Sequence, residues 1–107
     1  MNGCESIHIT QAAQDDLLAG FWFYEAQQSG IGTYFLDSLS ADIDSLQISA
    51  GVHVKTTADP IYRSLASRFP FAIYYIQQGP AVTVIAVLDT RRSPEWLRQR
   101  QVSIQPT

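Results

Sequence analysis

The chain has 107 residues, the usual size of one domain, and we interpret residues 1–107 as a single folded unit. Hydrophobic residues make up 46% and charged residues 16%, a balance that excludes an intrinsically disordered protein. The longest apolar runs are too short to cross a bilayer, and the first residues lack the pattern of a signal peptide. Because the single cysteine, Cys4, cannot form an internal disulfide, we expect a cytoplasmic protein.

The net charge of −3 is unevenly distributed along the chain. Residues 1–60 hold eight of the ten acidic residues and one of the seven basic residues, whereas residues 61–107 hold six arginines and two acids. This asymmetry indicates one acidic face and one basic face, and the basic face is suited to an acidic partner. The overall negative charge disfavours broad, nonspecific binding to nucleic acid, which depends on many phosphate contacts.

The first part of the chain predicts a strand and a helical hairpin. Residues 5–10 alternate between apolar and polar, which indicates a short strand, and residues 11–28 have the apolar spacing of a helix. Four consecutive aromatic residues, Phe21 to Tyr24, make the apolar surface of this helix wide, so we expect it to contact more than one neighbour. Gly20 lies mid-helix, where glycine costs about 1 kcal/mol, and close packing against another helix explains it. A glycine-rich break leads into a second helix over residues 33–46.

The second part of the chain predicts strands. A loop over residues 49–60 precedes strands over residues 61–69, 71–77 and 81–89. The last strand is almost continuously apolar, which is typical of a central strand covered on both faces. Ser93, Pro94 and Glu95 suit the start of a short helix, and the last residues predict a tail.

The predicted order of elements indicates an α+β fold. We expect an N-terminal antiparallel helix hairpin packed on a mostly antiparallel sheet of about four strands, with a short C-terminal helix.

Three segments carry a resemblance to a known family: GIGTYFLDSL at residues 30–39, YRSLASRFPFAIYYI at residues 62–76, and VIAVLDTRRSPEWLRQR at residues 84–100. Together they resemble the RelE/ParE toxin superfamily, and more narrowly its ParE-like plasmid-stabilisation branch. The resemblance extends from about Ile7 to Arg100. It implies a small toxin of a type II toxin–antitoxin system, neutralised by a cognate antitoxin protein encoded beside it.

Two activities are known in this superfamily. RelE-like members cleave mRNA in the ribosomal A site, and ParE-like members inhibit DNA gyrase. Matched by position, Arg92 falls where the RelE-like branch has a catalytic arginine, but Phe71 and Trp96 fall where that branch has an arginine and a tyrosine. An indole cannot act as a general acid or base, so the resemblance favours gyrase inhibition over endoribonuclease activity. A third alternative is a non-toxic member that binds only its antitoxin, and DNA only through that partner.

The candidate site residues are the aromatic and basic residues around the last strands. We expect contact with a partner or target from Arg63, Arg91, Arg92, Trp96, Arg98 and Arg100, and in the ribonuclease alternative the catalytic candidates are Arg68 and Arg92.

Structural roles compete with these functional ones. Arg91 and Arg92 are suited to anion contact, or to bridges with Asp89 or Glu95. Arg63 and Arg68 equally suit a structural role in which the stem packs on aromatic rings and the head pairs with an acid, and the indole of Trp96 suits the core.

No metal or cofactor is implied. His8 and His53 have no neighbour at metal-ligand spacing, and Cys4 does not complete a site. The aromatic run at Phe21 to Tyr24 is typical of a core, but a toxin must also present an apolar groove where an antitoxin helix or strand docks.

Overall fold

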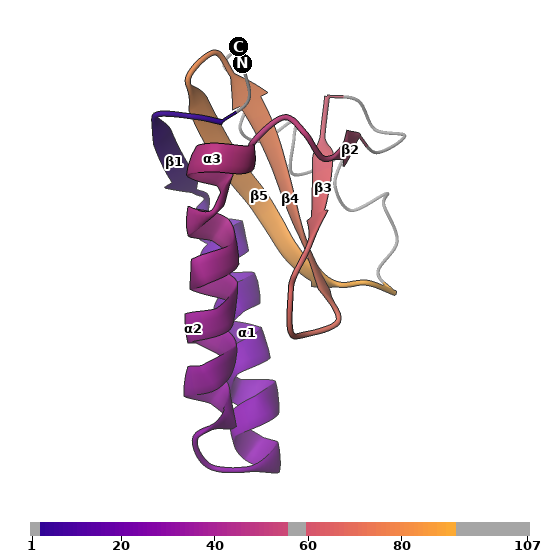
Figure 1. Ribbon diagram of the computed structural model, residues 1–107. Coiled ribbons are helices and arrows are strands. Elements are labelled where there is room, and N and C mark those ends of the chain that lie inside the picture. Colours follow the sequence, from indigo (N-terminus) through magenta and orange to yellow (C-terminus); the bar gives the residue numbers. More distant parts are fainter. Residues whose placement is uncertain (1–2, 56–59, 92–107) are drawn as a thin grey trace.

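The computed structural model describes residues 3–55 and 60–91 (Figure 1). The elements of these residues, in chain order, are β1 (Ser6–Ile9), α1 (Gln11–Gln27), α2 (Ile31–Asp44), α3 (Leu46–Ser49), β2 (Val54–Lys55), β3 (Tyr62–Leu65), β4 (Phe71–Gln78) and β5 (Ala81–Asp89).

The strands form one sheet in the order β1-β5-β4-β3-β2. β1 pairs with β5 in parallel, and the other neighbours are antiparallel. The α1–α2 hairpin crosses one face of this sheet, and its tip extends past the ends of the strands (Figure 1). The predicted α+β class is therefore confirmed, and the described sheet has five strands where about four were expected.

A bulge in β5 divides the apolar residues of this strand between the two faces of the sheet. Tyr74 pairs with Ala86 but Tyr75 pairs with Val84, so Ile85 is an extra residue that reverses the alternation. On the helix side, the core combines α2 and the sheet through the buried side chains of Phe35, Leu39, Ile43, Ile73, Tyr75, Val82, Val84 and Val87. A second buried cluster consists of Ile61, Ala72, Tyr74, Ile76, Ile85, Ala86 and Leu88. The central position predicted for this strand is correct.

Glycines and one carboxylate fix the helical hairpin. Gly30 has a φ of 95°, in the left-handed region that favours glycine, and it has no side chain that could cap α2. The carboxylate of Glu25 supplies the cap instead, because it accepts hydrogen bonds from Gly30 N (3.0 Å) and Gly32 N (3.0 Å). The expected close packing at Gly20 is present, since a Cβ there would collide with the ring of Phe35 on α2.

Three predicted boundaries differ from the structure. The strand expected over residues 61–69 is only Tyr62–Leu65, because the chain turns at Ala66 to return to Phe71. The predicted loop 49–60 contains the strand β2, and the end of the second helix is a separate turn, α3. Short pairings of this kind depend on tertiary contacts, and local sequence patterns carry little signal for them.

The helix expected from Ser93 and the tail after it lie outside the described residues. Within the part of the chain that the structure describes, no helix is long and apolar enough to cross a membrane.

Candidate functional site

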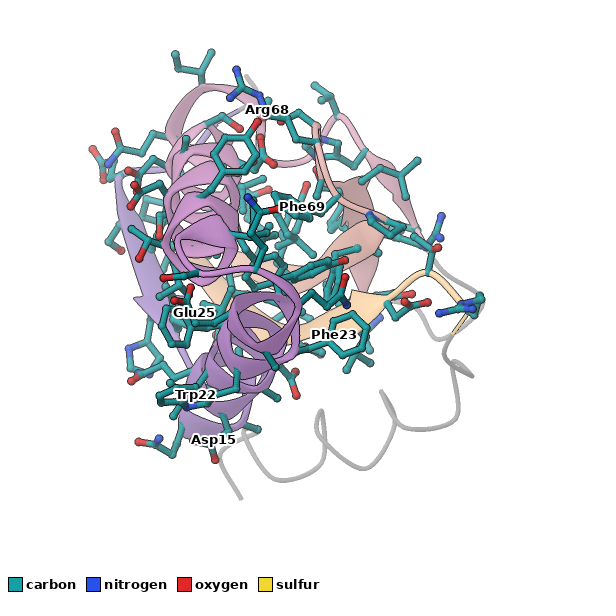
Figure 2. All side chains as sticks on the ribbon, turned by 90° about the horizontal axis from the view of Figure 1, so that it is seen from below. Asp15, Trp22, Phe23, Glu25, Arg68 and Phe69 are labelled. Atoms are coloured by element: carbon teal, nitrogen blue, oxygen red, sulfur yellow. The ribbon has the colours of Figure 1, made fainter. Side chains whose placement is uncertain are left out.

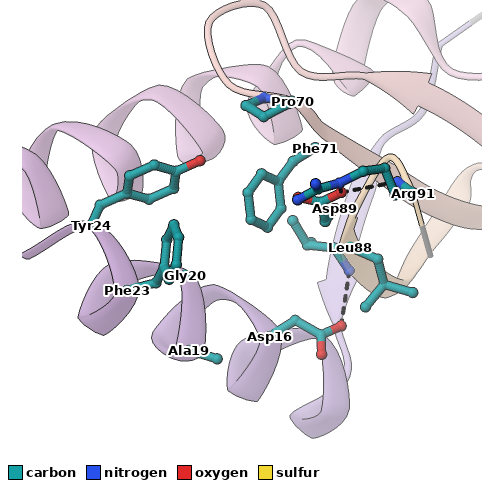
Figure 3. Close-up of a pocket in the computed structure, with 11 residues that line it drawn as sticks. Asp16, Ala19, Gly20, Phe23, Tyr24, Pro70, Phe71, Leu88, Asp89 and Arg91 are labelled. Carbon is teal, nitrogen blue, oxygen red and sulfur yellow. Dashed lines mark hydrogen bonds and ion pairs between the residues drawn. The ribbon is translucent and has the colours of Figure 1, made fainter. Parts of the chain in front are cut away.

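A groove lies between α1 and the ends of β4 and β5 (Figure 3). It exists because β1 stops at Ile9 and the chain turns into α1, while β5 continues past it to Asp89. The cavity has a volume of about 540 Å³, and we call it the α1–β5 groove. Its described lining is mostly apolar: Ala19, Gly20, Phe23, Tyr24, Pro70, Phe71, Val87 and Leu88, with Asp16, Asp89 and Arg91 as the charged members.

Asp16 joins the two walls of the α1–β5 groove. Past the end of β1, the backbone amide of Val87 points away from β4, and it donates to the Asp16 carboxylate at 3.0 Å. This contact satisfies an amide that β1 is too short to reach. Asp16 therefore links α1 to β5 across the groove.

An aromatic cluster closes the inner end of the groove. The ring of Phe71 packs against Phe35 at 5.0 Å between centroids, and Tyr24 packs against Phe69 at 4.9 Å. Such edge-to-face pairs add about 0.5–1.5 kcal/mol each beyond area burial, so they stabilise this wall. Burial raises the pKa of Tyr24, the charge of Asp89 raises it further, and Arg91 partly opposes this. The phenol of Tyr24 therefore stays protonated at neutral pH.

An ion pair forms the charged rim. Arg91 donates from Nε to Asp89 Oδ1 at 2.9 Å and from Nη2 to Asp89 Oδ2 at 3.1 Å. Its backbone amide also donates to Asp89 Oδ1 at 2.9 Å, which fixes the turn after β5. The hydrogen bond to Asp89 raises the pKa of Arg91. For Arg91, the structure therefore contains the predicted bridge to Asp89. The Arg91 side chain is still 88% exposed to solvent.

The other described arginines are held elsewhere. Arg68 donates to the hydroxyl of Tyr34 at 3.2 Å and lies 5.8 Å from that ring, beside a small cavity next to α2. Arg63 donates from Nε to the hydroxyl of Tyr74 at 3.3 Å. Both guanidinium groups thus bind tyrosine hydroxyls, where the structural alternative expected an acidic partner, and contact with another molecule stays a prediction for both. Arg68 and Arg91 line different cavities, and the predicted Arg92, Trp96, Arg98 and Arg100 lie outside the described residues.

His53 has a structural role. Its Nδ1 lies 2.7 Å from the hydroxyl of the fully buried Tyr75, which also accepts from Gly51 N at 2.9 Å. The Gly51 amide, the Tyr75 hydroxyl and His53 Nδ1 all have a hydrogen-bond partner when the hydroxyl donates to a neutral His53. Burial lowers the pKa of His53, in agreement with this arrangement. Among residues 3–55 and 60–91, no group of His, Cys, Asp and Glu side chains could hold a metal ion.

Sequence reasoning missed the groove residues Asp16, Gly20, Tyr24 and Asp89 as a group. The one available signal was the difference in length between the first strand and the last, which leaves the end of the last strand without a neighbour on one side. The side chains that fill this space come from residues 16–24 on one side and residues 70–91 on the other, and no local pattern links them.

No family model matches the sequence, and no curated protein matches it. Among solved structures, the chain is similar to one described as the chromosomal ParDE TA system from P. aeruginosa, with a TM-score of 0.70. The two share the same fold. Their sequences are 16% identical, and the similarity covers 77% of this chain and 91% of the other. The RelE/ParE-like fold expected from the sequence is therefore confirmed.

Proposed function

We propose that the chain is the toxin component of a type II toxin–antitoxin system. In this proposal it binds and inhibits DNA gyrase in the cytoplasm, and a cognate antitoxin encoded beside it neutralises it. The observation that carries the proposal is the fold shared with the ParDE TA system chain over 91% of that chain. The sequence segments that resemble the ParE-like branch support it independently.

The α1–β5 groove supports a role in protein binding. Its described lining is mostly apolar, and apolar grooves are where helices of partner proteins dock. Phe23 stands at its edge with 60% of the side chain exposed, and exposed aromatic residues are enriched where partners dock. We propose that the antitoxin covers this groove.

The charged groups of the groove support binding over catalysis. A general acid or base works best when its pKa is near the operating pH. The pKa of Tyr24 is shifted upward, away from neutrality. Asp89 is engaged by Arg91, and Asp16 accepts the Val87 amide. These contacts favour binding over acid–base catalysis by these three residues.

A supercoiling assay tests the proposal. Purified protein is added to gyrase with relaxed plasmid and ATP, and the product of the neighbouring reading frame is then titrated in. We expect supercoiling to fall with increasing protein and to recover at a one-to-one ratio with the antitoxin. Unchanged supercoiling together with mRNA cut at codons, seen by primer extension, would establish the ribonuclease alternative. If neither effect appeared, the chain would be a member that only binds its antitoxin.

A further inference from the structure

The second buried cluster lies on the face of the sheet opposite the α1–α2 hairpin, and we call this side of the sheet the second face. In the paired register, Ala72 lies opposite Leu88 and Tyr74 lies opposite Ala86, so these side chains are neighbours in the middle of the sheet. Every member of the cluster is apolar or aromatic and at most 5% exposed. The second face is therefore shielded from solvent as well as the face that carries the helices.

No described helix covers the second face. The buried apolar side chains of α1, α2 and α3 belong to the core on the helix side, and among residues 3–55 and 60–91 no helical residue belongs to the second cluster. An antiparallel sheet with one face open to water places polar residues on that face, whereas the central parts of β4 and β5 are apolar on both faces. A further layer must therefore lie on the second face.

The covering layer is narrow. Leu65 pairs with Ala72 and shares the second face with it, but the Leu65 side chain is 60% exposed. Toward the other edge of the sheet, His8 of β1 pairs with Thr83 and is exposed as well. Burial is therefore concentrated on β4 and β5, a width of about 10 Å at the usual spacing of strands. A single segment of chain is enough to cover this width.

We propose that residues 92–107 of the same chain cover the second face. The burial is that of one isolated chain, so neither a second copy nor a partner protein is needed to explain it. The other segments outside the described residues, 1–2 and 56–59, are too short to cover two strands.

The length and starting point of residues 92–107 fit this role. They follow β5 directly, close to Leu88 at one end of the second face. The distance along β5 from Leu88 to Thr83, which pairs with Ile76, is about 17 Å at the usual rise of a strand. Even as a compact helix, residues 92–107 would extend about 24 Å. The segment is therefore long enough to return along the whole of the buried area.

Trp96 is the principal contact that the sequence offers. It has the largest side chain of residues 92–107, and aromatic side chains bury about 150–250 Å² each. On the second face, Ala72 and Ala86 are diagonal neighbours on adjacent strands, and their small side chains leave room for a large ring. We therefore place the indole of Trp96 over these two alanines, in agreement with the core position that suits it.

This placement also gathers the predicted contact arginines on one side of the molecule. Arg92, Arg98 and Arg100 belong to the covering segment. Arg63 lies on the same side, because its Nε donates to the hydroxyl of Tyr74. The basic face expected from the sequence is then the side of the sheet opposite the acidic hairpin.

Tryptophan fluorescence of the full chain tests the burial of Trp96. Trp22→Phe leaves Trp96 as the single tryptophan, and Trp96→Phe leaves Trp22 as the matched control. The Trp22 side chain is 61% exposed and lies on the side of α1 that points away from α2 (Figure 2). We expect acrylamide to quench Trp96 several-fold less than Trp22, and unfolding in urea to abolish the difference. Equal quenching in the two folded proteins would overturn the proposal.

Nuclear Overhauser effects in the Trp22→Phe protein locate the indole. We expect contacts from the ring protons of Trp96 to the methyl groups of Ala72, Ala86 and Ile85, and none to Val82 on the helix side. A sample mixed from labelled and unlabelled chains separates contacts within one chain from contacts between copies. Contacts to Ala19 in the α1–β5 groove, or to a second copy, would contradict the assignment.

Neither measurement depends on toxicity. If induced protein does not arrest growth but Trp96 contacts the second face, the proposed function fails and the covering segment stands. If growth arrests but Trp96 is quenched as readily as Trp22, the inference about the second face alone fails.

Discussion

Several single side chains in this protein accept hydrogen bonds from backbone amides that have no partner within their own helix or sheet. Glu25 caps α2 across the hairpin turn, because Gly30 at the N-cap has no side chain. Asp16 receives the Val87 amide, because β1 ends too early. The Tyr75 hydroxyl accepts from Gly51 N and donates to His53 Nδ1, and both residues precede β2. Each contact joins two elements, so each can be tested by one substitution.

Glu25→Ala should destabilise the protein. Removing the carboxylate leaves the amides of Gly30 and Gly32 without their cap, which costs about 1–2 kcal/mol in the free energy of unfolding. Urea denaturation measures this loss. Gln27→Ala, at an exposed position on the same helix, is the matched control and should stay within about 0.5 kcal/mol of the wild type. Similar losses in both variants would show that Glu25 is not a cap.

Gly20→Ala should also destabilise the protein, although alanine is favoured over glycine by about 1 kcal/mol in a helix interior. The added Cβ collides with the ring of Phe35, which is fully buried and cannot move aside. Overpacking of this kind costs about 1–3 kcal/mol. The free energy of unfolding is measured for Gly20→Ala, Phe35→Leu and the double variant. Gly20→Ala should cost less stability when Phe35 is already replaced by leucine. A net gain in stability from Gly20→Ala alone would contradict the close packing.

At the scale of elements, the sequence predicted which segments pair or pack but not how each one ends. The helix hairpin and the central last strand follow from glycine positions and from a continuous apolar run. The bulge at Ile85 does not, since every residue from Val84 to Leu88 is apolar and any register would bury them. Strand β2 and the turn at Ala66 likewise depend on partners distant in the chain.

The candidate site was less predictable than the fold for the same reason. The arginine candidates were chosen by residue type, and in the structure Arg68 and Arg63 donate to the hydroxyls of Tyr34 and Tyr74. Arg91 is at the groove, but Asp89 holds it there. The groove is a consequence of unequal strand lengths, and that comparison requires knowing which strands are neighbours.

The contact between α1 and β5 should depend on Asp16. Asp16→Ala leaves the buried Val87 amide without its acceptor, a loss of about 1–3 kcal/mol in the free energy of unfolding. Hydrogen exchange at the Val87 amide should accelerate with it. Asp15→Ala serves as the control, because Asp15 is exposed and accepts from the Gln11 side chain within the same helix. Unchanged exchange at Val87 in Asp16→Ala would contradict this account.

The segment around β2 should loosen in acid. Burial holds the pKa of His53 below its ordinary value of 6.5, so the folded protein binds fewer protons there than the unfolded chain. The resulting stability is fully present above pH 6.5 and falls as the pH drops toward the lowered pKa of His53. Protonation makes Nδ1 a donor, and the Tyr75 hydroxyl then loses its acceptor.

Urea denaturation between pH 5 and pH 8 measures this dependence. His53→Gln should flatten the acid side of the profile, and NMR titration should give His53 a pKa below 6.5. His8→Gln is the control and should leave the contribution of His53 in place. If the stability of His53→Gln fell with decreasing pH as steeply as that of the wild type, other groups would cause the pH dependence.

At the scale of the whole molecule, the two halves of the chain differ in charge and in the type of side chain that they expose. The helical half is acidic and exposes aromatic side chains, and the sheet half carries the arginines. The groove lies where the halves meet, with Phe23 from the first and the Asp89–Arg91 pair from the second. This arrangement suits a small protein that works by binding other proteins.

Induced expression without a partner tests this account most directly. Growth, nucleoid morphology and mRNA integrity are scored in the same culture, with and without co-expression of the product of the neighbouring reading frame. We expect growth arrest with abnormal nucleoids and intact mRNA, reversed by the co-expressed protein. Normal growth, or arrest accompanied by mRNA cut at codons, would contradict the central claim that the chain is a gyrase-inhibiting toxin.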